Sequence, residues 1–122
     1  MPKKVIYYED KKGNKPVKEF INRLNEKTKA KVLATANFLG ENWGNIGRPI
    51  VDYIGNDIYE LRVQFSLDRI RILYAYMFKD YIVLLYGIFK NVAKIPETDK
   101  LRAKKRMIDF QIRYKEGRIK LK

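Results

Sequence analysis

The sequence contains neither cysteine nor histidine. Without cysteine there is no disulfide framework, no thiolate metal site and no cysteine nucleophile, which fits a reducing cytoplasm. Without histidine a Ser-His-Asp triad is impossible, and a zinc site would need carboxylates alone, for which no paired spacing occurs. A Walker A loop and a Gly-x-Gly-x-x-Gly turn are also missing. The sequence therefore predicts no metal and no cofactor, and it leaves the chemistry to lysine, arginine, tyrosine and glutamate.

Long apolar runs are missing as well. No run approaches the roughly 20 residues that span a bilayer. Near the start of the sequence, the four apolar residues Val5 to Tyr8 are followed at once by charged residues, and four are too few for the core of a signal peptide. A chain of 122 residues with 46% hydrophobic residues suits one domain, residues 1–122, with a core of its own. We expect a soluble, cytoplasmic protein with no membrane partner.

Positive charge is in excess. Lysine and arginine number 27 against 14 aspartate and glutamate residues, a net charge of +13. The half from Tyr59 to Lys122 carries 16 basic and 7 acidic residues. Such a field attracts nucleic acid, an anionic membrane or an acidic protein, and charge alone does not choose among them.

The hydrophobic pattern predicts three helices and four strands. Their order is β-α-α-β-β-β-α, and the last three strands are expected to form antiparallel hairpins. Helices and sheet segregate in this order, which predicts a two-layer α+β domain with a small antiparallel sheet packed against helices. The expected strands are Val5 to Tyr8, a strand around Ile58 to Phe65, one around Arg69 to Tyr76, and Ile82 to Phe89; the helices begin at Pro16, near Thr28 and at Pro96.

Three details accompany this pattern. The stretch from Trp43 to Gly55 has three glycines and one proline, so it is expected to be a connecting loop. The last helix is expected to end at Gly117. Its buried stripe is predicted to comprise Leu101, Met107, Ile108, Phe110 and Tyr114.

Two neighbouring strands carry arginines that alternate with apolar residues. Because side chains alternate across a strand, Leu61 and Val63 can enter the core while Glu60 and Arg62 stay on the other face. In the next strand, Arg69 and Arg71 would stand out beside Arg62. Several arginines and one carboxylate on a rigid sheet resemble a site that binds a phosphodiester. Alternatively, Arg62 could pair with Glu60 or Asp68 across an exposed hairpin.

Lysine, arginine, tyrosine and glutamate can cleave RNA without a metal. The 2′-hydroxyl attacks the adjacent phosphorus, so the protein must orient the strand, stabilise charge on the phosphoryl oxygens and move two protons. An arginine fork grips two phosphoryl oxygens and keeps its charge. The basic face of the last helix, with Arg102 and Lys105, is either a solvated face or a track for phosphates.

Several segments together resemble one known family. They are Gly13 to Phe20, Tyr59 to Arg62, Arg69 to Tyr74, Ile82 to Lys90, and Lys94 to Pro96 with Ala103 and Arg106 beyond. In order and spacing they are similar to the phage-derived HigB-like branch of the RelE/ParE toxins, across about Val5 to Phe110. The family's element order is the one predicted above.

This resemblance implies the toxin of a bacterial type II toxin-antitoxin pair. Members of the RelE and HigB groups cut mRNA, commonly in the ribosomal decoding site, leaving a 2′,3′-cyclic phosphate and a 5′-hydroxyl. The implied partners are mRNA, the ribosome and a HigA-like helix-turn-helix antitoxin, with operator DNA bound only through the antitoxin complex. Two alternatives stay open: a ParE-like toxin that inhibits gyrase, or an inactive relative that only binds an antitoxin.

The resemblance also implies roles for single residues. It assigns Arg71 to the developing phosphoryl charge, and Arg62 and Lys90 to substrate phosphates or leaving-group protonation. Glu60 and Tyr86 are candidate proton acceptors. The residues expected to bind RNA are Arg69, Lys94, Arg102 and Lys105.

The chain departs from the family pattern at three positions. Tyr86 stands where a histidine is frequent, Asn91 replaces a second lysine, and Ile95 replaces the threonine that caps the last helix. An imidazole acid-base role is therefore excluded. The helix cap is left to Thr98 or to no residue.

Overall fold

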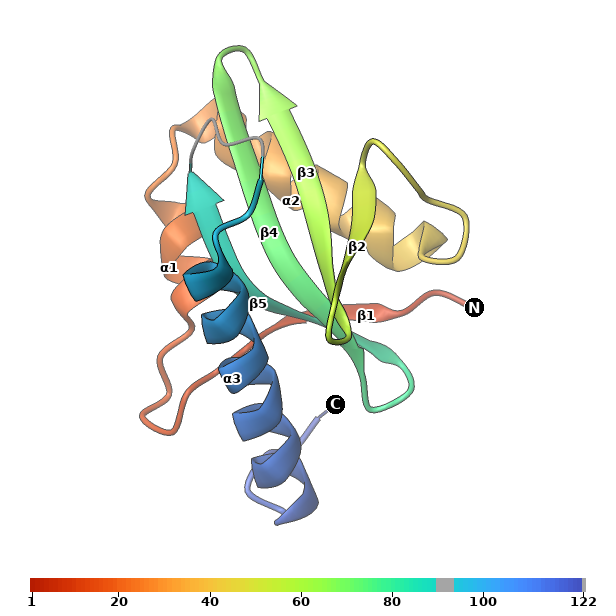
Figure 1. Cartoon of the computed structure of the whole chain (residues 1–122), viewed down its shortest axis with the longest axis vertical. Coiled ribbons are helices and arrows are strands. Elements are labelled where there is room, and N and C mark those ends of the chain that lie inside the picture. Colours follow the sequence, from red (N-terminus) through yellow and green to blue (C-terminus); the bar gives the residue numbers. More distant parts are fainter. Residues whose placement is uncertain (90–93, 122) are drawn as a thin grey trace.

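A computed structural model describes residues 1–89 and 94–121 of the chain (Figure 1). The elements are β1 (Lys4–Tyr7), α1 (Pro16–Asn22), α2 (Glu26–Asn42), β2 (Val51–Gly55), β3 (Ile58–Phe65), β4 (Asp68–Met77), β5 (Tyr81–Phe89) and α3 (Glu97–Lys115). None of the helices in these residues is long and apolar enough to cross a bilayer. The predicted order was wrong at one place, because the expected loop from Trp43 to Gly55 contains β2.

The strands form a mixed sheet in the order β1-β5-β4-β3-β2. From β2 to β5, neighbouring strands are antiparallel, as expected of hairpins, but β1 runs parallel to β5. The prediction of an antiparallel sheet is therefore corrected at this edge. A parallel pair needs a long connection. Two helices and three further strands separate β1 from β5 in the chain.

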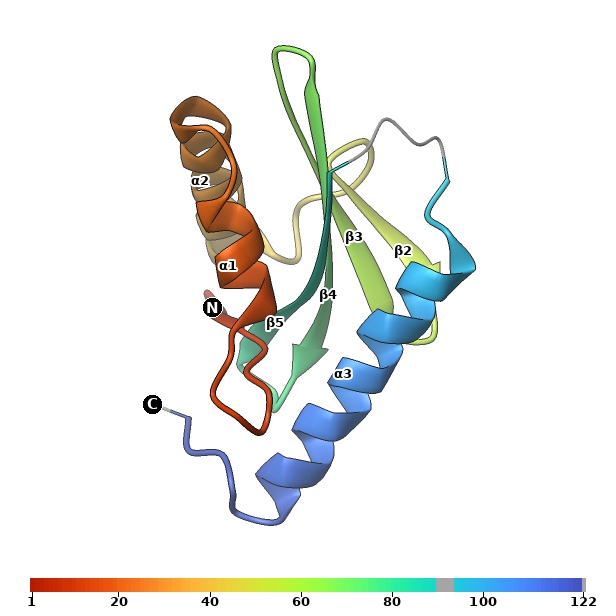
Figure 2. The ribbon, with the colours of Figure 1, turned by 90° about the vertical axis from the view of Figure 1, so that its left-hand side faces the viewer.

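Helices cover both faces of this sheet, so the α+β domain has three layers instead of two (Figure 2). Leu61, Ile72 and Leu84 belong to the core under α1 and α2. Leu73 and Leu85 belong to a second core under α3. A central strand that is apolar at successive positions needs cover on both faces, and α3 supplies the second cover.

The helix ends follow local chemistry. Pro16 is the first residue of α1, as expected. Asn25 is the N-cap of α2 and accepts a hydrogen bond of 2.9 Å from the backbone N–H of Thr28. The Thr28 hydroxyl donates instead to Asp68 at 2.6 Å, so it fastens the start of α2 to β4. Helix α2 thus begins at Glu26, close to Thr28, near which the sequence predicted its start.

Helix α3 begins at Glu97 after the N-cap Pro96, which makes no side-chain cap hydrogen bond. It is followed by Gly117, whose φ of +73° suits glycine. The predicted stripe was partly wrong: Met107 and Phe110 are buried, but Leu101, Ile108 and Tyr114 are exposed. The buried residues of α3 are Ala103, Met107, Phe110 and Arg113.

Strand β5 contains a bulge. Tyr86 pairs with Leu73, and Leu84 pairs with Tyr74, so Leu85 is an extra residue between them. Leu85 and Tyr86 both contact the core under α3. Arg106 of α3 donates a hydrogen bond of 2.7 Å to the carbonyl oxygen of Leu85. The bulge thus fastens α3 to the middle of β5.

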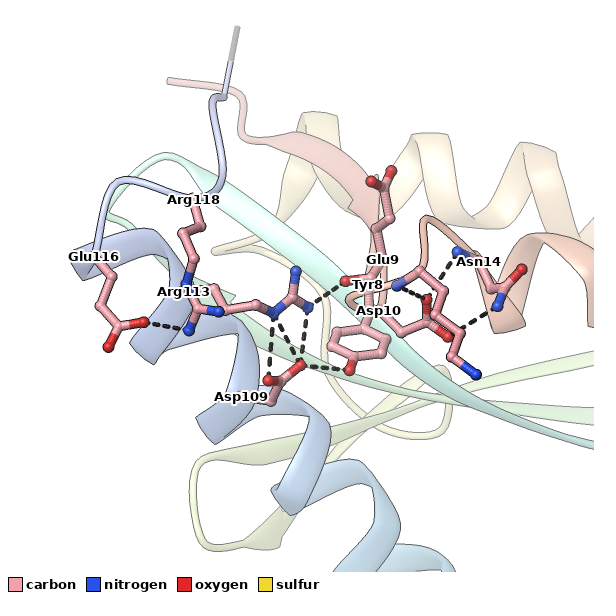
Figure 3. Close-up of polar contacts among 9 residues, drawn as sticks. Tyr8, Glu9, Asp10, Asn14, Asp109, Arg113, Glu116 and Arg118 are labelled. Atoms are coloured by element: carbon pink, nitrogen blue, oxygen red, sulfur yellow. Dashed lines mark hydrogen bonds and ion pairs between the residues drawn. The ribbon is translucent and has the colours of Figure 1, made fainter.

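A polar cluster holds the other end of α3 to the segment after β1 (Figure 3). The Tyr8 hydroxyl donates to Asp109 at 2.6 Å, and Arg113 donates to the same carboxylate at 2.8 Å. Arg113 also donates to the carbonyl of Glu9. Burial and the hydrogen bond to Asp109 raise the pKa of Tyr8 to about 12. The hydrogen bond from Arg113 keeps the pKa of Asp109 below its ordinary value, so this ion pair survives mild acid.

Gly40 lets α2 pass close to the start of β1. A β-carbon at Gly40 would lie 2.8 Å from the carbonyl oxygen of Lys3 and 2.8 Å from a methyl of Val5. We expect Gly40→Ala to lower the free energy of unfolding by about 1–3 kcal/mol, measured by urea denaturation. Gly44→Ala is the control, because its β-carbon meets nothing within 4 Å. Equal stability of the two variants would contradict the close packing of α2 on β1.

Candidate functional site

Strands β3, β4 and β5 bring the predicted site residues to the sheet face that α3 partly covers. Arg62 pairs with Arg71 across β3 and β4, and Glu60 pairs with Leu73 in the next row. Tyr86 of β5 extends this second row, opposite Leu73. The alternation along β3 and β4 places Glu60, Arg62 and Arg71 on one face, as predicted from the sequence, and the bulge in β5 brings Tyr86 to the same face. We call Glu60, Arg62, Arg71 and Tyr86 the strand site.

Glu60 bridges the two arginines. One carboxylate oxygen accepts a hydrogen bond from Nε of Arg62 at 3.0 Å, and the other lies 3.0 Å from Nε of Arg71. Arg62 also reaches Asp52 of β2 at 3.3 Å, and Asp52 accepts from Arg48 at 2.9 Å. The result is a chain of alternating charges, Arg48, Asp52, Arg62, Glu60 and Arg71. The hydrogen bond from Arg48 and the charge of Arg62 hold the pKa of Asp52 below its ordinary value.

The glutamate is the most buried member of this series, and the two arginines that it bridges are more exposed. The side chain of Glu60 is 4% exposed, that of Arg71 15% and that of Arg62 32%. The sequence left Arg62 a choice between Glu60 and Asp68; in the structure it pairs with Glu60, while Asp68 binds the start of α2. A guanidinium carries five N–H donors. One buried carboxylate thus pairs with Nε of both arginines, and both arginine side chains keep some exposure to solvent.

Helix α3 adds two arginines around Tyr86. Arg102 donates a hydrogen bond of 3.0 Å to the Tyr86 hydroxyl oxygen, and this bond raises the pKa of Arg102. The guanidinium of Arg106 lies 5.0 Å from the centre of the Tyr86 ring. Burial lowers the pKa of Arg106. Because Arg102 is a donor only, the hydroxyl hydrogen of Tyr86 remains available for another acceptor.

The other predicted RNA-binding residues lie on β4, just before α3 and on α3. Arg69 continues the β4 face beyond Arg71 and is exposed. Lys94 is exposed just before α3, and Lys105 is exposed on α3 itself. Arg102 contacts the strand site through its hydrogen bond to Tyr86. Lys90 lies outside the described residues, so its placement stays a prediction.

A hollow of about 400 Å³ adjoins Arg62 at the edge of the sheet. It lies where β3 runs past the end of β2, and its walls come from α2 and β3. Phe38 and Ile50 contribute exposed apolar surface there, and Gln64 contributes an amide. The hollow offers space for a flat group beside the outer arginine.

The sequence did not predict that Asp52 and Arg48 belong to the site, or that Arg106 lies against the ring of Tyr86. Asp52 and Arg48 lie in the segment that was predicted to be a loop, so their alignment with Glu60 was not foreseen. The register of β2 reveals it, because Asp52 is the direct partner of Glu60. The signal was the short alternating run from Val51 to Ile54, which the nearby glycines and proline obscured.

Comparison with known proteins gives one family. The model of the Gp49-like phage-derived proteins matches residues 19–108, about three quarters of the chain. The matched range includes the whole strand site and the N-terminal half of α3. No curated protein matches the sequence.

Proposed function

Because the chain belongs to the Gp49-like family of phage-derived proteins, which is associated with the toxins of toxin-antitoxin pairs, we propose that it is such a toxin and that it cleaves mRNA. The proposal includes the finer HigB-like assignment, with action on the ribosome. The observation that carries it is the arginine pair on adjacent strands, held by one buried glutamate. A planar guanidinium group can donate two parallel hydrogen bonds to two phosphoryl oxygens, which a lysine ammonium group cannot do.

The reaction proposed for the strand site is an in-line transfer. The 2′-oxygen of one nucleotide bonds to the adjacent phosphorus, and the bond from phosphorus to the 5′-oxygen breaks. Arg71 stabilises the negative charge that grows on the phosphoryl oxygens, and Arg62 binds a phosphate at the open side. The products are a 2′,3′-cyclic phosphate and a 5′-hydroxyl.

Proton transfer is assigned to the other side of the site. Arg102 fixes the Tyr86 oxygen in the row next to the arginines, where in its deprotonated form it is proposed to accept the proton of the attacking 2′-hydroxyl. Lys90 is assigned to the leaving 5′-oxygen. Glu60 is a positioning residue in this proposal, because both of its oxygens face arginines. The histidine of related toxins is thus replaced by a tyrosine with an arginine partner.

The test is brief induction of the protein in bacterial cells, followed by mapping of RNA ends. We expect new 5′-hydroxyl ends within coding regions soon after induction, with cyclic phosphate on the matching 3′ ends. Uninduced cells serve as the control. Growth arrest with intact mRNA and loss of DNA supercoiling would contradict the nuclease proposal in favour of a gyrase toxin. Normal growth with intact mRNA would favour an inactive relative.

The proposed partner is a helix-turn-helix antitoxin, through which alone the complex binds operator DNA. A neighbouring gene for a small protein of this pattern would support the assignment. Its co-expression is expected to restore growth of the induced cells.

A further inference from the structure

The hollow beside Arg62 lies where β3 extends past the start of β2. The ladder between these strands reaches the pair of Val51 and Leu61, and one more hydrogen bond of 2.8 Å joins the N–H of Arg62 to the carbonyl oxygen of Ile50. Strand β3 continues from there to Phe65, and α2 packs against it, behind the strand in the view of Figure 1. We call this space of about 400 Å³ the α2 hollow.

The apolar lining of the α2 hollow includes an aromatic ring. Phe38 of α2 is 50% exposed, and Ile50, just before β2, is 38% exposed. Val63 and Ala34 add further apolar surface. A half-exposed phenylalanine can stack on a planar ring. Ligand pockets have volumes of about 300–1,000 Å³, so a hollow of this size suits one flat ring with its sugar better than a long chain.

The polar lining of the α2 hollow is basic or neutral. Its charged residues are Lys31 of α2 and Arg62, and no aspartate or glutamate is among the described residues that line it. Gln64 contributes an amide, which can both donate and accept a hydrogen bond. Lys31 and Gln64 are exposed, so a ligand can replace the water around them. This set of groups matches the phosphate and the base edge of a nucleotide.

We propose that the α2 hollow binds one base of an RNA strand whose phosphate is held by Arg62. The ring of the base stacks on Phe38, the Gln64 amide pairs with the edge of the base, and Lys31 meets a neighbouring phosphate. The position of this base beside the cleaved bond rests on the proposed function, because Arg62 belongs both to the strand site and to the α2 hollow. The binding of a base does not rest on it.

An apolar side chain of a partner protein is the other occupant of suitable size. It would pack on Phe38 and Ile50, but it would gain nothing from the amide of Gln64 or the charge of Lys31. A nucleotide uses all three kinds of group, and a net charge of +13 attracts a polyanion. The observations therefore favour RNA.

The two side chains that contact the base have different tasks. Stacking accepts every base, because every base has a flat face, whereas hydrogen bonds at the edge distinguish one base from another. Phe38 is therefore assigned to affinity and Gln64 to the choice of base. Among RNA ends mapped after induction, we expect one base to prevail at a fixed distance from the cut. Gln64→Leu is expected to weaken this preference about fivefold while cleavage continues, and Gln111→Leu, on the exposed part of α3, to leave it unchanged.

The binding test uses the whole protein and 2′-O-methylated tetranucleotides, which cannot be cleaved because the attacking oxygens are blocked. NMR signals of the Ile50 methyl groups and the Gln64 amide are expected to shift. Phe38→Ala is expected to weaken binding about fivefold or more, since the stacked base loses its aromatic partner. The matched control is Leu33→Ala, an apolar residue of α2 that is 40% exposed and lies outside the lining of the α2 hollow.

Tetranucleotides with one abasic residue, at each position in turn, identify the base that is bound. At one position the missing base is expected to weaken binding to the wild type, but to weaken binding to Phe38→Ala no further. Such non-additive losses are the mark of a direct contact between the base and Phe38.

The inference and the proposed function fail separately. If mRNA stays intact in induced cells but the tetranucleotide binds in the way described, the nuclease proposal fails and the α2 hollow remains a site for a base. The inference is overturned if Phe38→Ala binds every tetranucleotide as tightly as the wild type does. It is also overturned if N-acetylleucine amide shifts the Ile50 and Gln64 signals at a lower concentration than the tetranucleotide, which would assign the α2 hollow to a protein partner.

Discussion

Arg71→Ala is expected to reduce mRNA cleavage by about 100-fold or more and to abolish toxicity, because it removes the fork proposed to stabilise the phosphoryl charge. Arg71→Lys is expected to restore little, since an ammonium keeps the charge but not the planar pair of donors. The measurement is the rate at which 5′-hydroxyl ends appear after induction. It is repeated with purified ribosomes and a defined mRNA.

A loss of activity must be separated from a loss of fold. Arg71→Ala leaves Glu60 with one arginine fewer, so some loss of stability is expected as well. Gly40→Ala is a suitable control, because it is expected to destabilise the protein while the strand site stays intact. If Gly40→Ala remains active at equal stability and Arg71→Ala does not, the role is chemical. Full activity of folded Arg71→Ala would refute the assignment.

Glu60→Ala is expected to have the largest effect on stability among substitutions at the strand site. It leaves two guanidinium groups without their shared carboxylate, and breaking a fully buried pair costs about 3–5 kcal/mol. Because the Arg62 side chain is 32% exposed, solvent screens part of this cost, and we expect about 2–3 kcal/mol. Urea denaturation measures it. Asp52→Ala, at the more exposed carboxylate of the chain, is expected to cost less.

A double variant then separates the contribution of the ion pair to stability from the contribution of Arg71 to activity. Replacing both Glu60 and Arg71 by leucine removes the buried charges together and is expected to recover much of the stability that Glu60→Ala loses. The same double variant is expected to be inactive, since it lacks the Arg71 fork. A double variant as unstable as Glu60→Ala would show that the site depends on the ion pair for its fold.

The sequence was sufficient to predict which residues of β3 and β4 share a face. Alternation is a local rule, so the order of residues alone places Glu60, Arg62 and Arg71 together. The continuous apolar run of β5 likewise indicated a strand covered on both faces. The same rule could not place Tyr86 beside them, because the bulge at Leu85 interrupts the alternation.

The remaining errors concern long-range arrangement. Nothing local shows that β1 lies parallel to β5, or that α3 crosses to the face opposite α1 and α2. The strand β2 was not predicted, because glycines and a proline surround it. The ion pair of Arg62 with Asp52, a residue of β2, was therefore not predicted either. The carboxylates that hold the arginines were thus the least predictable part of the candidate site.

If the protein acts on RNA as proposed, the series of ion pairs also separates the attraction of RNA over a distance from its binding at the site. The series of ion pairs contains three arginines and two carboxylates, so its net charge is only +1, whereas the whole protein carries +13. Long-range attraction therefore arises from the rest of the surface and sets the rate of encounter, which falls steeply as salt screens it. In the proposed reaction the chemical step depends on short contacts at Arg62 and Arg71, so we expect added salt to slow the encounter of protein and RNA far more than the cleavage that follows.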